Sequence, residues 1–237
     1  MIFTPLAVFA FDMTYILFFF LPALALSFFA SWYTKSTFNR YKEIPGSKGF
    51  TGAQAANEML RRNGVNNCTI EITQGFLSDH YDPRSRTLRL SPDVYNGRSL
   101  SAIGVACHEA GHALQHAQSY AFLNMRSAMC PLVGIGNQVG NICLIAGLFL
   151  SSRPFMLIGI IGLALAFLFT VITLPVEWDA SARAKKAMMT AGLLAPREVD
   201  GAGKVLNAAF LTYLASAISA LMTLIYYVLR YMGSNRD

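Results

Sequence analysis

Four long stretches of the chain carry no charged residue, and this feature constrains the fold more than any other. An α-helix needs about 20 apolar residues to cross the ~30 Å hydrocarbon layer of a bilayer. Each stretch is long enough, so we predict that each forms a membrane-spanning helix. The predicted spans are residues 13–33, 131–150, 155–175 and 205–229.

The second stretch differs from the others because it contains three side-chain amides. An amide is costly in lipid, so we expect Asn137, Gln138 and Asn141 to face a neighbouring helix or a polar cavity. Only residues 151–154 separate this stretch from the third one, and the two should form a tight helical hairpin.

Composition agrees with a membrane protein. Only 14% of the 237 residues are charged, against roughly 25% in soluble domains. The 54% hydrophobic content excludes collagen-like and disordered chains. For the first stretch the alternative is a cleaved signal peptide, but residues 1–12 contain no Lys or Arg, and the apolar run exceeds the usual length.

Lys and Arg residues orient such a chain, because they favour the cytoplasmic side. Of the 19 positive residues, 11 lie in segment 34–130 and five in segment 176–204. Both segments should therefore face the cytoplasm, with the two termini outside. This topology explains the net charge of +6, and no basic stripe with interleaved aromatic residues points to a nucleic-acid partner.

Segment 34–130 is long enough for a small α+β domain with its own core. A first helix is expected over 51–63, with Ala53, Ala56, Met59 and Leu60 on its apolar face. Short strands are expected over 68–73, 76–81 and 86–90, followed by a helix from Ser99 or Ser101 through Gln118. Segment 176–204 is predicted to be a further cytoplasmic helix. The four cysteines lack zinc-finger spacing, so we expect free thiols.

The last helix of this domain carries the sequence CHEAGHALQH, which contains an HExxH motif. Residues four apart share one helix face, so His108 and His112 can bind a single metal ion while Glu109 reaches a metal-bound water. Zinc lowers the pKa of such a water toward ~7, and the glutamate accepts its proton. Gly111 should leave room for a substrate backbone. The alternative is two histidines at the polar edge of a half-buried helix.

A catalytic zinc ion needs a third protein ligand. His116 lies one turn beyond His112, but a third ligand from the same helix would crowd the ion, and we expect it outside the coordination sphere. Glu177 is the better candidate, because it follows the third span on the side of the polar domain. The alternative for Glu177 is a carboxylate that marks the end of a span.

The segments HEAGHALQHA and LPVEWDASARA, the latter after a membrane span, resemble the YugP-like family of membrane neutral zinc metallopeptidases. The wider relatives are gluzincins such as HtpX and the CAAX prenyl protease. The resemblance covers most of the chain. It implies a zincin-like cytoplasmic domain, one zinc ion per chain, a bacterial cell membrane as location, and a peptide or protein substrate that includes membrane proteins.

The same resemblance implies roles for individual residues. It implies His108, His112 and Glu177 as zinc ligands and Glu109 as the general base. In the wider gluzincin pattern an Asp four residues after the ligand Glu orients a ligand histidine. This chain has Ser181 there, so that role passes to a hydroxyl group or to Asp179.

Residues outside the motif helix are candidates for holding the substrate. His80 or Tyr81 can donate a hydrogen bond to the oxyanion of the reaction, or can be ordinary turn and strand-end residues. The strand 87–90 can be an edge that receives an extended peptide, although ordinary pairing within the sheet is favoured.

Three functions follow from these features. The leading prediction is a membrane-bound zinc endopeptidase whose site faces the cytoplasm at the membrane surface. The first alternative is a site-2-type intramembrane protease, which places HExxH inside a span and uses an Asp ligand. The second is a catalytically silent membrane scaffold or small transporter, although spans without charged residues make a poor ion pathway.

Overall fold

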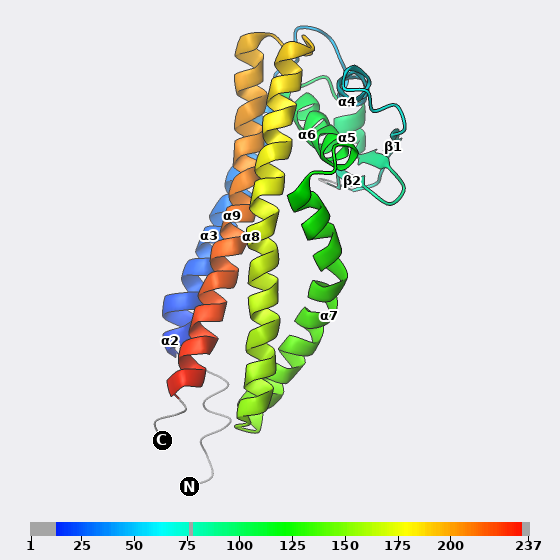
Figure 1. Cartoon of the computed structure of the whole chain (residues 1–237). Coiled ribbons are helices and arrows are strands. Elements are labelled where there is room, and N and C mark those ends of the chain that lie inside the picture. Colours follow the sequence, from blue (N-terminus) through cyan, green and yellow to red (C-terminus); the bar gives the residue numbers. More distant parts are fainter. Residues whose placement is uncertain (1–12, 76–77, 234–237) are drawn as a thin grey trace. The chain divides into compact units, whose positions relative to one another are not determined.

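The computed structural model describes residues 13–75 and 78–233, which form long helices and one small sheet (Figure 1). The helices are α2 (Met13–Tyr15), the π-helical turn η1 (Ile16–Phe20), α3 (Leu21–Lys42), α4 (Gly52–Arg62), α5 (Pro92–Tyr95), α6 (Leu100–Ala117), α7 (Ala121–Phe149), α8 (Arg153–Thr190) and α9 (Pro196–Gly233). The strands are β1 (Thr69–Ile72), β2 (His80–Asp82) and β3 (Thr87–Leu90). The predicted fold class, a mainly α membrane protein with a small α+β domain, is confirmed.

The chain divides into two compact units. Of the described residues, the first comprises 13–29, 125–173 and 213–233, and the second comprises those of Ala30–Asn124 and Leu174–Thr212. Helices α3, α7, α8 and α9 each contribute residues to both units.

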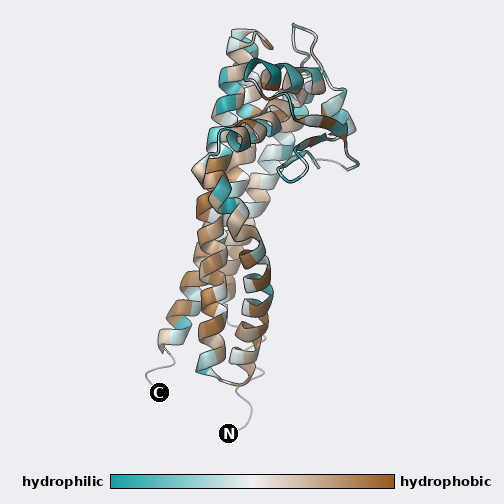
Figure 2. Ribbon diagram, turned by 45° about the vertical axis from the view of Figure 1, so that its right-hand side comes forward, coloured by the Kyte–Doolittle hydropathy of each residue, from teal (hydrophilic) through white to brown (hydrophobic). Residues whose placement is uncertain are grey.

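The first unit is built from the apolar parts of four helices. Among the described residues, four helical stretches are long and apolar enough to cross a membrane: Met13–Lys42, Ala121–Phe149, Arg153–Thr190 and Pro196–Gly233. They contain the four predicted spans, except that Leu150 follows the end of α7, and their apolar residues appear brown in Figure 2. Many large apolar side chains on them are exposed, such as Phe28, Ile142 and Ile161, as expected where lipid covers them.

Glycine, rather than amides, brings α7 and α8 together. A Cβ atom added to Gly162 would lie 2.9 Å from the Cα atom of Gly140, so the two backbones are in direct contact. Asn137, Gln138 and Asn141 are exposed, and Asn141 donates to Asn137 one turn earlier over 3.3 Å. The first alternative, that these amides face a neighbouring helix, is therefore wrong, since small residues occupy the contact; the second, a polar cavity, stays a prediction.

Helix α8 does not end where its sequence predicted. Pro175 lies inside it, and the helix continues through Thr190. The chain then turns at Gly192, whose φ of +62° suits a residue without a Cβ atom. Helix α9 begins at Pro196, as proline favours the first helical position. The prediction of one separate helix over 176–204 is thus wrong, because this segment consists of the end of α8, a turn and the start of α9.

The second unit contains a three-stranded mixed sheet in the order β1-β3-β2. Strand β3 pairs in parallel with β1 and antiparallel with β2, so it is the central strand. The hypothesis that strand 87–90 is a free edge is therefore wrong. Of the strand expected over 76–81, Phe76 and Leu77 lie outside the described residues, and the observed strand begins at His80.

Helices α4 and α6 have the ends that their sequences indicate. Thr51 and Gln54 form a reciprocal capping box at the start of α4. Ser99, rather than Ser101, caps α6 by accepting a hydrogen bond from the amide of Ala102. The predicted apolar face of α4 is buried in a core that also includes residues of β3, α6, α8 and α9. This core holds α6, which carries the HExxH motif, in place.

Candidate metal centre

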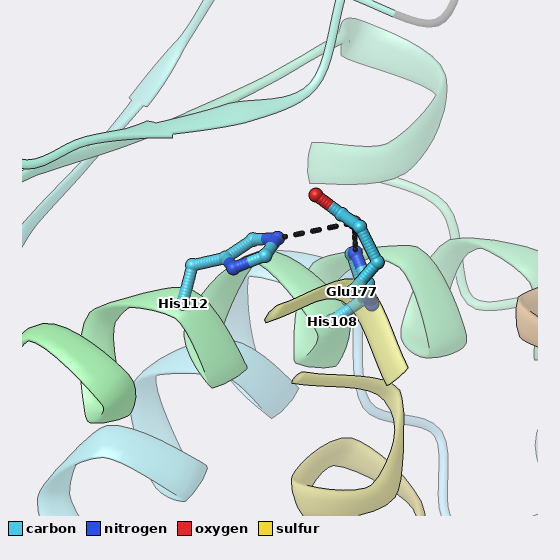
Figure 3. A group of neighbouring side chains, drawn as sticks. All are labelled: His108, His112 and Glu177. Carbon is cyan, nitrogen blue, oxygen red and sulfur yellow. Dashed lines mark hydrogen bonds and ion pairs between the residues drawn. The ribbon is translucent and has the colours of Figure 1, made fainter. Parts of the chain in front are cut away.

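Three side chains with metal-ligating atoms converge in the second unit: His108 and His112 from α6, and Glu177 from α8 (Figure 3). One ligand atom from each lies within 4.8 Å of the other two. The Oε2 atom of Glu177 is 3.2 Å from Nε2 of His108 and 3.5 Å from Nε2 of His112. The same nitrogen of each ring therefore faces the carboxylate.

Helical spacing and a glycine create this arrangement. The two histidines are one turn apart on α6, and their ring centroids lie 4.8 Å from each other. Between them in sequence stands Gly111, where an added Cβ atom would be 2.7 Å from the carbonyl oxygen of Ala180 on α8. The expectation that Gly111 makes room for a substrate backbone is therefore wrong. It makes room for the backbone of α8, which brings Glu177 to the histidines.

The donor set fits a zinc ion of the catalytic kind. Glu177 is only 2% exposed and His112 only 8%, and a carboxylate buried this deeply needs charged or hydrogen-bonding partners. Two imidazoles and one carboxylate are a known set of protein ligands for catalytic zinc, which keeps a further position for water. His116, the alternative third ligand, is not part of the cluster.

Glu109 follows His108 on α6 and is partly buried. Burial raises the pKa of its carboxyl group above the ordinary value, and the carboxylates of Glu177 and Asp79 act in the same direction, while the two imidazoles oppose them. A raised pKa makes the carboxylate a stronger base, which favours its acceptance of a proton.

The second ring nitrogen of each clustered histidine has its own partner. Nδ1 of His108 lies 3.1 Å from the hydroxyl oxygen of Ser181. Nδ1 of His112 lies 3.0 Å from Oε1 of Gln115. Sequence reasoning had pointed to Ser181 but not to Gln115. The available signal was its position three residues after His112, on the same side of the helix.

Asp179 belongs to the same network as Gln115. Its Oδ2 atom accepts a hydrogen bond of 2.8 Å from Nε2 of Gln115, and also one from the guanidinium group of Arg183. Arg183 donates in addition to the side chain of Gln118. Within the part of the chain that the structure describes, Asp179 is thus connected to His112 through Gln115.

The other candidates lie apart from the three clustered side chains. The Tyr81 hydroxyl group and Nδ1 of His116 are 2.8 Å apart and form a pair of their own. Burial raises the pKa of Tyr81 to about 12, so its hydroxyl group stays protonated at neutral pH. His80 is exposed, and its Nδ1 atom lies 2.8 Å from the carbonyl oxygen of Ser78. Neither His80 nor Tyr81 has a hydrogen bond to the cluster in the described residues.

Known proteins point to the same chemistry. A family described as "putative neutral zinc metallopeptidase" matches residues 15–232. The chain is 43% identical over 217 residues to the "putative membrane protease YugP" of Bacillus subtilis strain 168, covering 92% of this chain and 96% of that protein. No solved structure matches the chain. The relative and the four apolar helices support a bacterial membrane protein. Because the family match runs through nearly the whole chain, the chain belongs to this family of zinc metallopeptidases.

Proposed function

We propose that the protein is a membrane-bound zinc endopeptidase with its active site at the cytoplasmic face of the membrane. One zinc ion per chain is held by His108, His112 and Glu177. The observation that carries this proposal is the convergence of these three donors, contributed by two helices, beside Glu109. Peptides or proteins are the substrates, and membrane proteins are one candidate class.

When bound, zinc lowers the pKa of a water molecule toward ~7 and polarises a peptide carbonyl group. Glu109 takes the proton from the water at its carboxylate and later gives it to the leaving amine. Ser181 and Gln115 hold the two imidazoles by their Nδ1 atoms.

The position of α6 supports a site at the membrane surface, because this helix is not among the four apolar stretches. This observation disfavours the intramembrane protease.

The test measures zinc content and hydrolysis of an unfolded protein by the full-length chain in detergent. Wild type should contain about one zinc ion and cleave the substrate. Glu109→Gln should keep the zinc but lose at least about 100-fold in rate, since general base catalysis contributes roughly 10²–10⁴. Glu43→Gln, a change at an exposed glutamate, is the matched control and should behave as wild type.

Two results would contradict the proposal. Absence of zinc from purified wild type would contradict the proposed metal centre. Full activity of Glu109→Gln would show that Glu109 is not the general base. An unchanged cellular phenotype of the Glu109→Gln variant would instead favour the scaffold.

A further inference from the structure

Gln115 is completely buried, with 0% of its surface exposed. A buried side-chain amide has two donor hydrogens and an acceptor oxygen that all require partners. Gln115 has three partners: Nδ1 of His112, the carbonyl oxygen of Val176 and Oδ2 of Asp179. The chemistry of these partners determines how the amide is oriented.

Two of the partners can only accept a hydrogen bond. The Val176 carbonyl oxygen and the Asp179 carboxylate each lie 2.8 Å from the same end of the amide, so this end must be the NH2 group. The oxygen of Gln115 therefore faces His112. Because an amide oxygen cannot donate, the 3.0 Å bond requires a proton on Nδ1 of His112.

We propose that Gln115, held by Asp179, is a positioning residue that fixes the tautomer of His112. With the proton on Nδ1, the neutral ring has its lone pair on Nε2, the nitrogen that faces Glu177 in Figure 3. This is the nitrogen that would bind zinc, so the inference rests on the proposed function for its purpose. The outer partner of a metal-bound histidine commonly sets ring orientation and tautomer in this way.

The two histidines differ in this respect. Ser181 faces Nδ1 of His108 with a hydroxyl group, which can donate as well as accept. It therefore fits either tautomer of His108. Gln115 fits one tautomer only, because Val176 and Asp179 prevent its amide from turning over. Arg183 in turn holds Asp179 from the other side.

The first experiment needs neither zinc nor activity. The chain contains only four histidines, so nitrogen NMR of the full-length, metal-free protein with labelled histidine can resolve each ring. Wild type should show a proton on Nδ1 of His112, whether or not Nε2, which faces Glu177, is protonated as well. Gln115→Met keeps the length of the side chain but removes the acceptor, and should shift His112 toward the Nε2-protonated tautomer. Ser181→Ala, the matched control, should leave the His112 signals unchanged.

The second experiment measures zinc affinity by competition with a chelator. Gln115→Met should bind zinc about 10- to 100-fold more weakly than wild type, the usual effect of losing an outer partner. Asp179→Ala leaves the Val176 carbonyl to hold the amide and should have a smaller effect. Thermal unfolding of each metal-free variant shows whether it is folded.

The outcomes separate this inference from the proposed function. If Nδ1 of wild-type His112 carries no proton, or if folded Gln115→Met binds zinc as tightly as wild type, the inference is overturned. If Gln115→Met does not fold, the wild-type spectrum still tests the inference through the proton on Nδ1 of His112. Asp179→Ala still tests it through the affinity for zinc. A wild type that binds no zinc yet shows the Nδ1 proton contradicts only the proposed function.

Discussion

At the scale of single residues, Glu177 is a carboxylate buried in the second unit. Its side chain is 2% exposed, and one oxygen lies between two imidazoles. A buried carboxylate is retained in a fold where it is paired or coordinates a metal. The cluster is thus better explained as a binding centre than as a marker of the end of a span.

Replacing Glu177 tests its role as the third ligand. Glu177→Gln keeps the size of the side chain but removes its charge, so we expect zinc affinity to fall by at least about 100-fold, as a directly bound ligand should matter no less than its outer partner. Chelator competition measures this loss, with Glu43→Gln as control. A variant that keeps one tightly bound zinc ion would show that another residue supplies the third ligand.

Cys107 precedes His108 in sequence but is shielded from solvent. It is 0% exposed, and burial raises the pKa of its thiol to about 12. Because the thiolate is the reactive form, we expect no labelling of Cys107 by thiol reagents in the folded protein up to about pH 10, and rapid labelling after unfolding. Mass spectrometry of labelled peptides measures both. Labelling at pH 8 without unfolding would show that α6 opens locally.

At the scale of secondary-structure elements, the contact between α6 and α8 decides whether the centre exists. Gly111→Ala would put a Cβ atom 2.7 Å from the carbonyl oxygen of Ala180. We expect this overpacking to lower the free energy of unfolding by about 1–3 kcal/mol, and to weaken zinc binding because α8 moves away with Glu177. Thermal or denaturant unfolding and chelator competition measure the two effects.

Gly134→Ala is the matched control, since Gly134 is also helical and an added Cβ atom there meets nothing within 4 Å. It should leave zinc binding unchanged. Equal effects of the two substitutions would refute the argument from close packing.

The elements also show how far sequence reasoning extends. The helix around HExxH and its cap at Ser99 follow from local rules, because capping and helical spacing involve residues a few positions apart. The central place of β3 does not follow, since alternation predicts a strand but not its neighbours. For the same reason the sequence does not reveal that Gly111 packs against Ala180, or that Gln115 bonds to Val176 and Asp179. Both depend on which residues of α8 lie against α6.

At the scale of the whole molecule, the distribution of charge makes a prediction about topology. The loop between α7 and α8 should lie outside the cell, since 16 of the 19 positive residues belong to the segments predicted to face the cytoplasm. In a chain whose own cysteines are replaced by alanine, Ser152→Cys should react with an impermeant thiol reagent in intact cells. Asn66→Cys, at an exposed position of the second unit, should react only after the membranes are opened. If Asn66→Cys reacted in intact cells and Ser152→Cys reacted only after the membranes are opened, the orientation would be the reverse of the proposed one.

The separation of the metal ligands along the chain has a consequence for biosynthesis. His108 and Glu177 are 69 residues apart, with α7 and the apolar part of α8 between them. A ribosome releases α6 first, and at that stage the growing chain offers two imidazoles without a third ligand. On the proposed mechanism, hydrolysis has to wait until three of the four spans have been made. If the proposed mechanism is correct, the order of its residues therefore keeps the nascent chain inactive until its third span has been made.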